Sequence, residues 1–301
     1  MNTPRQNRYL WIGLYGLIGL ALVIIISLFA QGVPPQEEPA FDGERALRDV
    51  AYQVALGPRT PGSEAHAQFL LWLQAELETT GWQVETQAAI RMDHEIKNIV
   101  ASRSDEPPDL ILAAHYDSRL FADQDPDPAL RQESVPGAND GASGVALLLE
   151  LSRVLPSDSV PVWLVFFDAE DNGDIPGWDW ILGSRAFVDT LTEEPSAVII
   201  LDMLGDVVLD IYFERNSDPL LSQEIWSQAD RLGYGDYFIQ EVKYSILDDH
   251  IPFVEAGIPA VDIIDFDYPY WHTTADTIDK VSMQSLQHVG ETLLAWIVNK
   301  P

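Results

Sequence analysis

Short apolar segments alternate along this sequence with longer segments that carry apolar residues at helical spacing. The short segments predict strands at Trp82–Ile90, Asn98–Ser102, Leu110–Ala114, Val162–Phe167, Ala197–Leu201, Asp210–Phe213 and Ala260–Ile264. The longer segments predict helices at Ala46–Leu56, Glu64–Thr79, Val145–Leu155, Gly183–Leu191, Leu220–Leu232, Ile251–Ala256 and Met283–Val298. This alternation favours an α/β fold, a three-layer α/β/α sandwich with a mixed, mostly parallel central sheet. A ligand site in such a fold lies beyond the carboxyl ends of the central strands.

Composition restricts the classes of function. With 301 residues, 47 % of them apolar, the chain is long enough to form one large globular domain. Its 17 basic and 48 acidic residues give a net charge of −31, which repels phosphate backbones and argues against nucleic-acid binding. The sequence has no cysteine, so a transition metal has to be bound by His, Asp and Glu.

The N-terminal region predicts a membrane anchor. Residues Leu10–Ala30 are almost wholly apolar, and as a helix they match the thickness of a bilayer core. Arg5 and Arg8 precede this run, and the next basic residue is Arg45. The positive-inside rule therefore predicts a single-pass protein of the cell membrane, with residues 1–9 in the cytoplasm and the rest of the chain outside.

A cleaved signal peptide is the alternative for the same region. Its apolar core is normally shorter, and the end of the run, SLFAQG, is a poor cleavage site. The proline-rich and acidic residues 31–42 then predict an extended linker, and residues 43–301 a catalytic domain.

Polar residues directly follow several of the predicted strands, in LILAAHYDSR, VWLVFFDAEDNG, VIILDMLGD and AVDIIDFDYPYWHTT. A glycine-flanked loop, PGANDGASG, adds a further carboxylate, and its Ser143 is expected to cap the helix that follows. One such residue alone is usually a hydrogen-bonded turn residue. Several carboxylates at one sheet edge repel each other unless a cation compensates for their charge. The candidate residues are His115, Asp117, Asp140, Glu170, Asp171, Asp202 and His272.

Zinc is the metal that best suits imidazole and carboxylate ligands without thiolates, and manganese and cobalt remain alternatives. Glu170 and Asp171 are adjacent, so their side chains leave the strand end in different directions. We therefore predict that Asp171 binds the metal and that Glu170 acts as the general base beside it.

An acidic loop at Ala122–Pro128 has aspartates at the alternating spacing of a calcium-binding loop. The sixth position of such a loop needs Gly and the twelfth needs Glu, but this sequence has Pro128 and Ser134 there. We predict a solvated acidic loop instead.

A set of motifs in this order resembles the glutaminyl-peptide cyclotransferases, which belong to a clan that also contains the di-zinc aminopeptidases. The motifs are PRTPGS, KNIVAS, HYDSR, PGANDGASG, FFDAED, LGSR, LDMLG, DDHIPF and WHT, and they extend over roughly residues 45–300. The resemblance implies a zinc enzyme that acts on the N-termini of peptides or proteins.

The resemblance also implies roles for individual residues. Asp140, Asp171 and His272 correspond to the ligands of one zinc, and Glu170 to the proton-transfer residue. In the aminopeptidase branch, His115 and Asp202 hold a second zinc bridged through Asp140, and a metal-activated water hydrolyses the peptide bond. In the cyclotransferase branch a single zinc polarises the side-chain amide of an N-terminal Gln. The α-amine of the substrate then closes the pyroglutamate ring and ammonia leaves, with Asp202 and Asp248 forming an acid network around the leaving amide.

Two residues favour the cyclotransferase. Asp248 is acidic at a position where the aminopeptidases usually are not, and Trp271 resembles the aromatic wall that keeps water out of the cyclotransferase pocket. Trp178 and Trp180 are further candidates for this pocket wall, and Phe266 and Tyr270 are weaker ones.

Other features favour different readings. Asp171 replaces a Glu that is common in the cyclotransferases, and HTTADTIDKVS resembles bacterial aminopeptidases. A third possibility is an inactive, receptor-like ectodomain. The sequence argues against it, because every position that would bind metal carries a residue able to do so. We expect His250 and Arg185 to support the site without binding metal. The other three histidines, His66, His94 and His288, are expected to lie in surface helices or loops.

Overall fold

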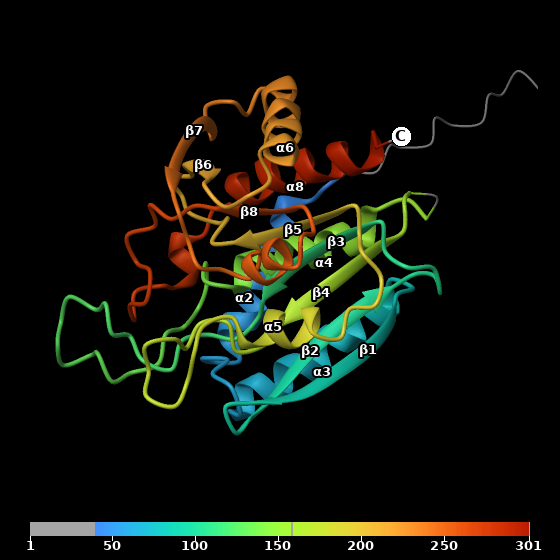
Figure 1. Ribbon diagram of the computed structural model, residues 1–301. Helices are drawn as coiled ribbons and strands as arrows, with labels where there is room; N and C mark the ends of the chain where they lie inside the picture. The colour runs from blue at the N-terminus through green and yellow to red at the C-terminus, as the bar shows by residue number, and fades with distance from the viewer. Residues whose placement is uncertain (1–39, 158, 301) are drawn as a thin grey trace, which may run out of the picture. The chain divides into compact units, whose positions relative to one another are not determined.

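The apolar segments predicted as strands pair into one mixed sheet. The structure, a computed structural model, describes residues 40–157 and 159–300. Its strands are β1 (Gln83–Arg91), β2 (His94–Ser102), β3 (Leu110–His115), β4 (Val162–Phe167), β5 (Ala197–Asp202), β6 (Ile211–Glu214), β7 (Phe238–Tyr244) and β8 (Ala260–Ile264). Six of them form a sheet in the order β1-β2-β4-β3-β5-β8 (Figure 1). β3 is parallel to β4 and β5, and β5 is parallel to β8, whereas β2 is antiparallel to both β1 and β4. The predicted mixed, mostly parallel sheet is confirmed.

Helices cover both faces of this sheet (Figure 1). They are α2 (Gly43–Ala55), α3 (Glu64–Thr79), α4 (Ala142–Val154), α5 (Leu182–Val188), α6 (Pro219–Leu232), α7 (Ile251–Glu255) and α8 (Met283–Val298), with a 3-10 helix at Ile278–Lys280. Side chains alternate along β3: Leu110 and Leu112 belong to the core shared with α2, α3, α4, α6 and α8, and Ile111 and Ala113 to the core shared with α5 and α7. All six residues of β3 are buried, as expected for a strand covered on both sides.

Most of the longer helices begin at a residue whose side chain accepts a backbone N–H. Asp42, Ser63, Asp218 and Ser282 fill this position for α2, α3, α6 and α8. The predicted cap at Ser143 is wrong, because α4 begins one residue earlier, at Ala142. The Ser143 hydroxyl instead donates to the Asn139 carbonyl at 2.5 Å and accepts the Leu204 amide at 3.1 Å.

β6 and β7 form a separate two-stranded parallel sheet. The sequence pattern missed β7, because only Phe238 among its residues is buried and no regular alternation of apolar and polar residues is visible. The chain leaves β7 at Tyr244 and then forms part of the wall of the site described below.

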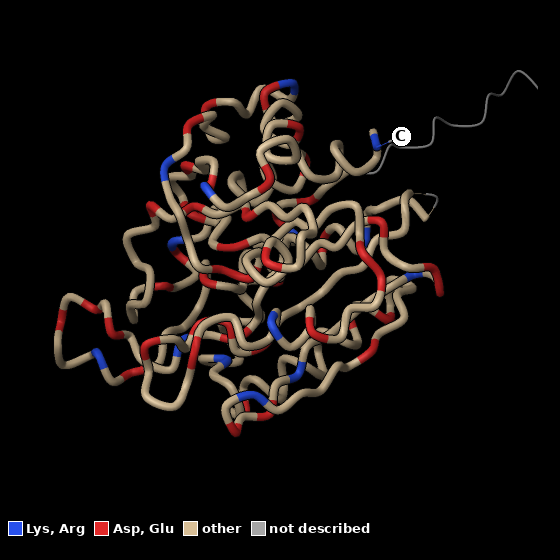
Figure 2. The backbone as a smooth tube through the Cα atoms, viewed as in Figure 1, with Lys and Arg blue, Asp and Glu red and all other residues tan. Residues whose placement is uncertain are grey.

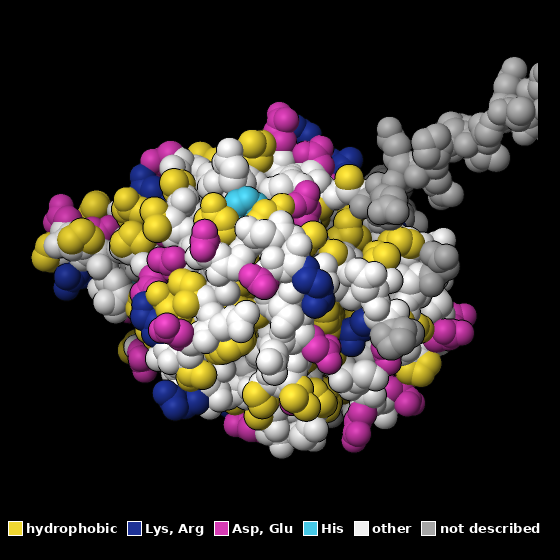
Figure 3. Space-filling model, turned by 90° about the horizontal axis from the view of Figure 1, so that it is seen from above, with side chains coloured by type: hydrophobic (Ala, Val, Ile, Leu, Met, Phe, Trp, Pro, Cys, Tyr) yellow, Lys and Arg dark blue, Asp and Glu magenta, His cyan; other side chains and the backbone are white. Residues whose placement is uncertain are grey.

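The chain has 48 acidic and 17 basic residues, which gives its net charge of −31. Figure 2 shows Asp and Glu distributed over the described backbone, with Lys and Arg between them. On the face seen in Figure 3, hydrophobic side chains are interspersed with polar and acidic ones. This charge distribution favours cationic or neutral partners over polyanions.

The predicted anchor, residues 10–30, lies outside the described residues, as does most of the predicted linker. Within residues 40–157 and 159–300, the structure has no helix that is both long enough and apolar enough to cross a bilayer.

Candidate metal centre

The carboxyl ends of the central strands bring the predicted metal ligands together. His115 is the last residue of β3 and Asp202 the last residue of β5, while Asp171 follows β4. Asp140 comes from the loop before α4, and His272 from the segment after β8. All five residues are buried, so their polar atoms need partners within the site.

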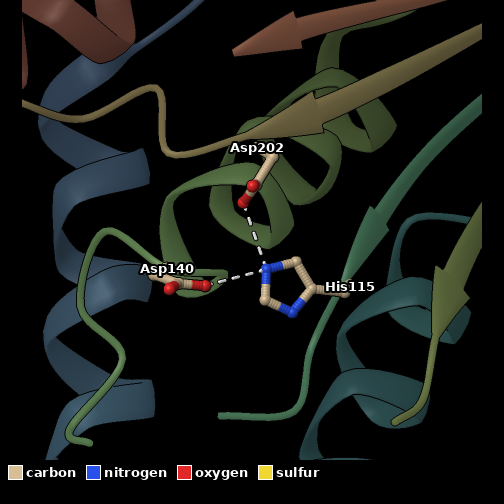
Figure 4. Close-up of side chains that lie close together, drawn as sticks. All are labelled: His115, Asp140 and Asp202. Carbon is tan, nitrogen blue, oxygen red and sulfur yellow. Dashed lines mark hydrogen bonds and ion pairs between the residues drawn. The ribbon is translucent and has the colours of Figure 1, made fainter. Parts of the chain in front are cut away.

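These five residues form two groups that share Asp140. In the first group, His115 Nε2 lies 3.1 Å from both Asp140 Oδ1 and Asp202 Oδ1 (Figure 4). In the second, His272 Nε2 lies 2.7 Å from Asp171 Oδ1 and 3.8 Å from Asp140 Oδ2. Within each group the potential ligand atoms all lie within 4.8 Å of one another. Each group therefore has the dimensions of a metal site, and Asp140 can bridge the two.

The donor atoms fit a cation such as zinc. Asp140 Oδ2 and Asp171 Oδ2 are buried without a hydrogen-bond partner among the described residues. Burial, together with neighbouring carboxylates, raises the pKa of Asp171 to about 6 and that of Asp202 to about 7. A cation would pair the orphaned oxygens and offset the repulsion, and imidazole with carboxylate is a donor set that zinc accepts.

A cavity of about 250 Å³ opens beside these ligands. Its walls include the carboxylates of Asp140, Glu170, Asp171, Asp202 and Asp248 and the aromatic rings of Trp180, Tyr244, Phe266 and Trp271. Trp271 stacks on the His272 ring with centroids 3.6 Å apart, and Trp180 lies parallel to the same ring at 6.0 Å. The cavity combines a polar floor with an aromatic wall, as small-molecule sites commonly do.

Comparison with known proteins agrees with this geometry. The family model described as peptidase family M28 matches residues 98–297. The chain belongs to this family.

Proteins similar to this chain carry two kinds of name. Glutaminyl cyclase from Tannerella forsythia is 34 % identical, with a TM-score of 0.82, over 87 % of this chain and 100 % of that one. A Zn-dependent exopeptidase from Parabacteroides distasonis is 33 % identical, with a TM-score of 0.83, over 87 % and 99 % of the two chains. Aminopeptidase YwaD of Bacillus subtilis is 31 % identical over 62 % of this chain, which spans only 40 % of that protein.

Glu170 lines the cavity described above and is adjacent in sequence to the candidate ligand Asp171. Its side chain is almost fully buried. Burial raises the pKa of Glu170 well above its usual range, and the nearby carboxylates of Asp171 and Asp248 raise it further, against a lowering by His115. A carboxyl group with a raised pKa is a stronger base than an ordinary carboxylate, which suits a residue that accepts a proton and returns it.

Asp117 supports the site from behind. Its carboxylate accepts the backbone N–H of Glu170 at 3.0 Å and of Asp171 at 3.4 Å, and the Asn172 side chain at 3.1 Å. The Asp117 Oδ1 atom also lies 3.6 Å from His115 Nδ1. This carboxylate therefore orients the segment after β4 and the His115 ring, which are typical tasks of groups behind a metal site.

Three residues at the metal centre have left-handed backbone conformations that are rare for non-glycine residues. They are Ala169 (φ 53°), Met203 (φ 50°) and His272 (φ 54°). Ala169 precedes Glu170, Met203 follows Asp202, and His272 is itself a candidate ligand. Such conformations concentrate at functional sites, where the surrounding structure enforces them. No local sequence signal predicts them.

The structure does not place Trp178 in the cavity. Its ring stacks on His94 with centroids 3.5 Å apart, and it packs against a small cluster of Ile96, Ala169 and Leu182. The expected pocket role thus applies to Trp180 and Trp271 but not to Trp178. Two residues further along the chain, Trp180 instead lies over Gly173, where a β-carbon would come within 2.2 Å of the indole ring.

The expectation for His66 is also wrong. His66 is buried, with its Nε2 atom 2.9 Å from Asp168 Oδ1, although the sequence suggested a surface helix. Most residues of the acidic loop are exposed, as predicted, but Asp125 is 3 % exposed and accepts the Thr274 amide at 3.0 Å and the Thr274 hydroxyl at 2.7 Å. This loop therefore fixes the segment that carries His272.

The remaining candidates lie outside the two candidate ligand groups. Arg185 forms an exposed ion pair with Glu255. His250 is fully buried, and its Nε2 atom lies 3.1 Å from Glu214 Oε2. Neither residue belongs to a ligand group among the described residues.

Proposed function

We propose that this M28 chain is a zinc-dependent glutaminyl-peptide cyclotransferase, an acyltransferase that converts N-terminal Gln of peptides to pyroglutamate and releases ammonia. The observation that carries this proposal is the position of Asp248. Its carboxyl group is 3 % exposed and lines the same cavity as Glu170 and the ligands. Asp248 Oδ2 has no hydrogen-bond partner among the described residues, so it is available to a substrate amide.

In this proposal Asp140, Asp171 and His272 hold the catalytic zinc. A zinc ion bound there supplies a Lewis acid for the side-chain carbonyl of the substrate Gln. The described residues then have to bind the substrate amine, move protons and exclude water.

Glu170 is the proton-transfer residue. The α-ammonium group of the substrate first loses one proton to solvent, and the freed amine forms the new C–N bond with the Cδ carbon of Gln. Glu170 takes the second proton from this nitrogen as the bond forms and returns it to the amide nitrogen as the Cδ–N bond breaks, so that ammonia leaves and the ring nitrogen keeps one hydrogen. Asp248, together with Asp202, accepts hydrogen bonds from this leaving nitrogen. The raised pKa of Glu170 suits both transfers.

The aromatic wall selects cyclisation over hydrolysis. Trp180, Phe266 and Trp271 line the cavity beside the candidate ligands, and in this proposal a peptide bound against these rings displaces water from the cavity. An attacking amine that belongs to the substrate itself needs no bound water, so exclusion of water removes only the competing nucleophile.

A second candidate function is a di-zinc aminopeptidase. The observation in its favour is the complete group of His115, Asp140 and Asp202, which offers ligands for a second ion. The relatives named as exopeptidase and aminopeptidase agree with it. In this case a metal-activated water releases the N-terminal residue.

Substitution of Asp248 tests the choice between these functions. Asp248→Asn keeps the shape of the side chain but removes the carboxylate near the leaving amide. For the cyclotransferase we expect ammonia release from a peptide with N-terminal Gln to fall by roughly 10²-fold, the low end of what proton-transfer groups contribute. Zinc content should not change. Asp189→Asn is the control, since Asp189 only pairs with Arg91 at the surface. An Asp248→Asn variant with wild-type turnover would refute the role given to Asp248.

We also propose that residues 10–30 anchor the protein in the cell membrane, with the catalytic domain on the extracytoplasmic side. The support is the length of the apolar run and the arginines that precede it. Protease added to intact cells should digest residues 43–301 while a cytoplasmic marker protein stays intact. Protection of the domain in sealed cells, or its release into the medium with a new N-terminus near Gln31, would contradict the proposal.

A further inference from the structure

We propose that Arg59 and Asp276 form a clamp that holds the Asp140 loop, residues 136–141, in its metal-binding conformation. The two side chains contact the backbone of the loop from separate parts of the chain. The inference rests on the metal centre of the proposed function and assigns positioning roles to two residues outside the cavity.

Arg59 binds the first half of the loop. Its guanidinium is fully buried and donates Nη1 to the Pro136 carbonyl at 3.2 Å and Nη2 to the Gly137 carbonyl at 2.6 Å. Its Nε donates to the Tyr116 carbonyl at 3.0 Å. Tyr116 directly follows His115, so one rigid, planar group fixes the Asp140 loop relative to the strand that carries another ligand.

Gly137 allows this close contact. It has a φ of +70°, and a β-carbon there would lie 2.9 Å from Arg59 Nη2 and 2.6 Å from the Asp140 carbonyl oxygen. The loop therefore has the shape that fits the guanidinium only with glycine at this position.

Asp276 binds the second half of the loop. Its carboxylate is fully buried and accepts the backbone N–H of Asn139 at 2.9 Å and of Asp140 at 3.3 Å. The Tyr268 hydroxyl donates to the same carboxylate at 2.6 Å. Because Asp276 follows His272 by four residues, it links the Asp140 loop to the segment of a third ligand.

The Asn139 side chain connects the loop to the segment that follows Asp202. It accepts the Gly205 amide at 2.7 Å and donates to the Met203 carbonyl at 3.2 Å, next to Asp202. The loop is thus joined to residues that closely follow His115 and Asp202, and to the segment after β8 that carries His272.

Fixing this loop matters because Asp140 belongs to both ligand groups. One of its oxygens lies 3.1 Å from His115 Nε2 and the other 3.8 Å from His272 Nε2, so a shift of the loop would disturb both sites at once. A loop already held in place does not lose conformational entropy when the metal binds. Arg59 and Asp276 do not line the cavity. They act through Asp140 and not on the substrate.

The test uses conservative substitutions and matched controls. Arg59→Lys keeps the charge but replaces the planar guanidinium, three nitrogens of which each donate to a different carbonyl, by a single nitrogen. Asp276→Asn turns an NH₂ group toward a backbone N–H. The control for Arg59 is Arg103→Lys, since Arg103 donates to the Leu155 and Ser152 carbonyls far from the ligands. The control for Asp276 is Asp218→Asn, since Asp218 accepts the amides of Leu220 and Leu221 at the start of α6.

Zinc affinity of the full chain is measured by competition with a chelating dye. We expect each clamp variant to bind zinc about 10–100-fold more weakly than wild type, the usual effect of removing a group behind a metal ligand. The visible absorption spectrum of the cobalt-loaded protein should change in the clamp variants as well, because it reports the ligand geometry. The control variants should keep the wild-type affinity and spectrum even where their melting temperatures fall.

Wild-type affinity and spectrum in a folded Asp276→Asn variant would overturn the clamp, whether or not Arg59→Lys folds. Equal weakening in the controls would overturn it too, since the effect would then reflect general destabilisation. A wild-type protein that binds no zinc would instead refute the proposed function itself, and the clamp would have no ligand to position.

Discussion

His272→Ala is expected to release the zinc from a protein that stays folded, and to abolish activity. A zinc site with three protein ligands and one open position cannot bind the ion tightly after it loses one of the three. His272 also provides the single imidazole of its ligand group, in which Asp140 and Asp171 provide carboxylates. Metal analysis of the purified variant, with circular dichroism to verify the fold, provides the measurement.

His288→Ala is the matched control, because His288 packs against the rings of Tyr234 and Tyr237 and belongs to neither ligand group among the described residues. It should keep the wild-type zinc content. His115→Ala distinguishes the two functions: the single zinc of a cyclotransferase should stay bound, whereas a di-zinc aminopeptidase should lose one of two ions. Stoichiometric zinc and full activity in His272→Ala would remove His272 from the ligand set.

Glu170→Gln is expected to lower turnover by roughly 10²–10⁴-fold, the usual contribution of a positioned general base. The substitution keeps the shape of the side chain but removes its ability to take the proton from the substrate amine. Zinc content should stay at the wild-type level, because Glu170 lies beside the ligands but does not belong to either group. The measurement is kcat with a peptide that begins with Gln, combined with metal analysis.

Glu255→Gln is the control for this substitution, since Glu255 is an exposed partner of Arg185. It should turn over substrate at the wild-type rate. Near-normal kcat in Glu170→Gln would require another base, and Asp248 in the same cavity is the first residue to test.

The convergence of the candidate ligands could be predicted from the sequence because several of them follow a local pattern. His115 and Asp202 end strands whose residues are all buried, and Asp171 follows a third strand of the same sheet. Neighbouring parallel strands end at one edge, so the order of apolar and polar residues already indicates convergence. The structure brings these residues together with Asp140 and His272.

The supports of the site could not be predicted in this way, because they depend on residues far apart in the sequence. Asp276 contacts a backbone 136 residues earlier, at Asp140, and Arg59 contacts Gly137 from 78 residues away. The tryptophans show the same limit: Trp178 and Trp180 are two residues apart, but the Trp178 ring stacks on His94 and the Trp180 ring lies parallel to that of His272. A local sequence pattern reflects residues that are close along the chain, and it does not show contacts between residues that are far apart in the sequence.

Mass spectrometry of two peptides after incubation with the protein tests the proposed reaction most directly. One peptide begins with Gln and the other with Leu, and the rest of their sequences is identical. The cyclotransferase predicts that the Gln peptide becomes lighter by one ammonia without being cleaved, because its α-amine closes a five-membered ring, and that the Leu peptide is unchanged. Release of free leucine without pyroglutamate formation would contradict this account and identify the chain as an aminopeptidase.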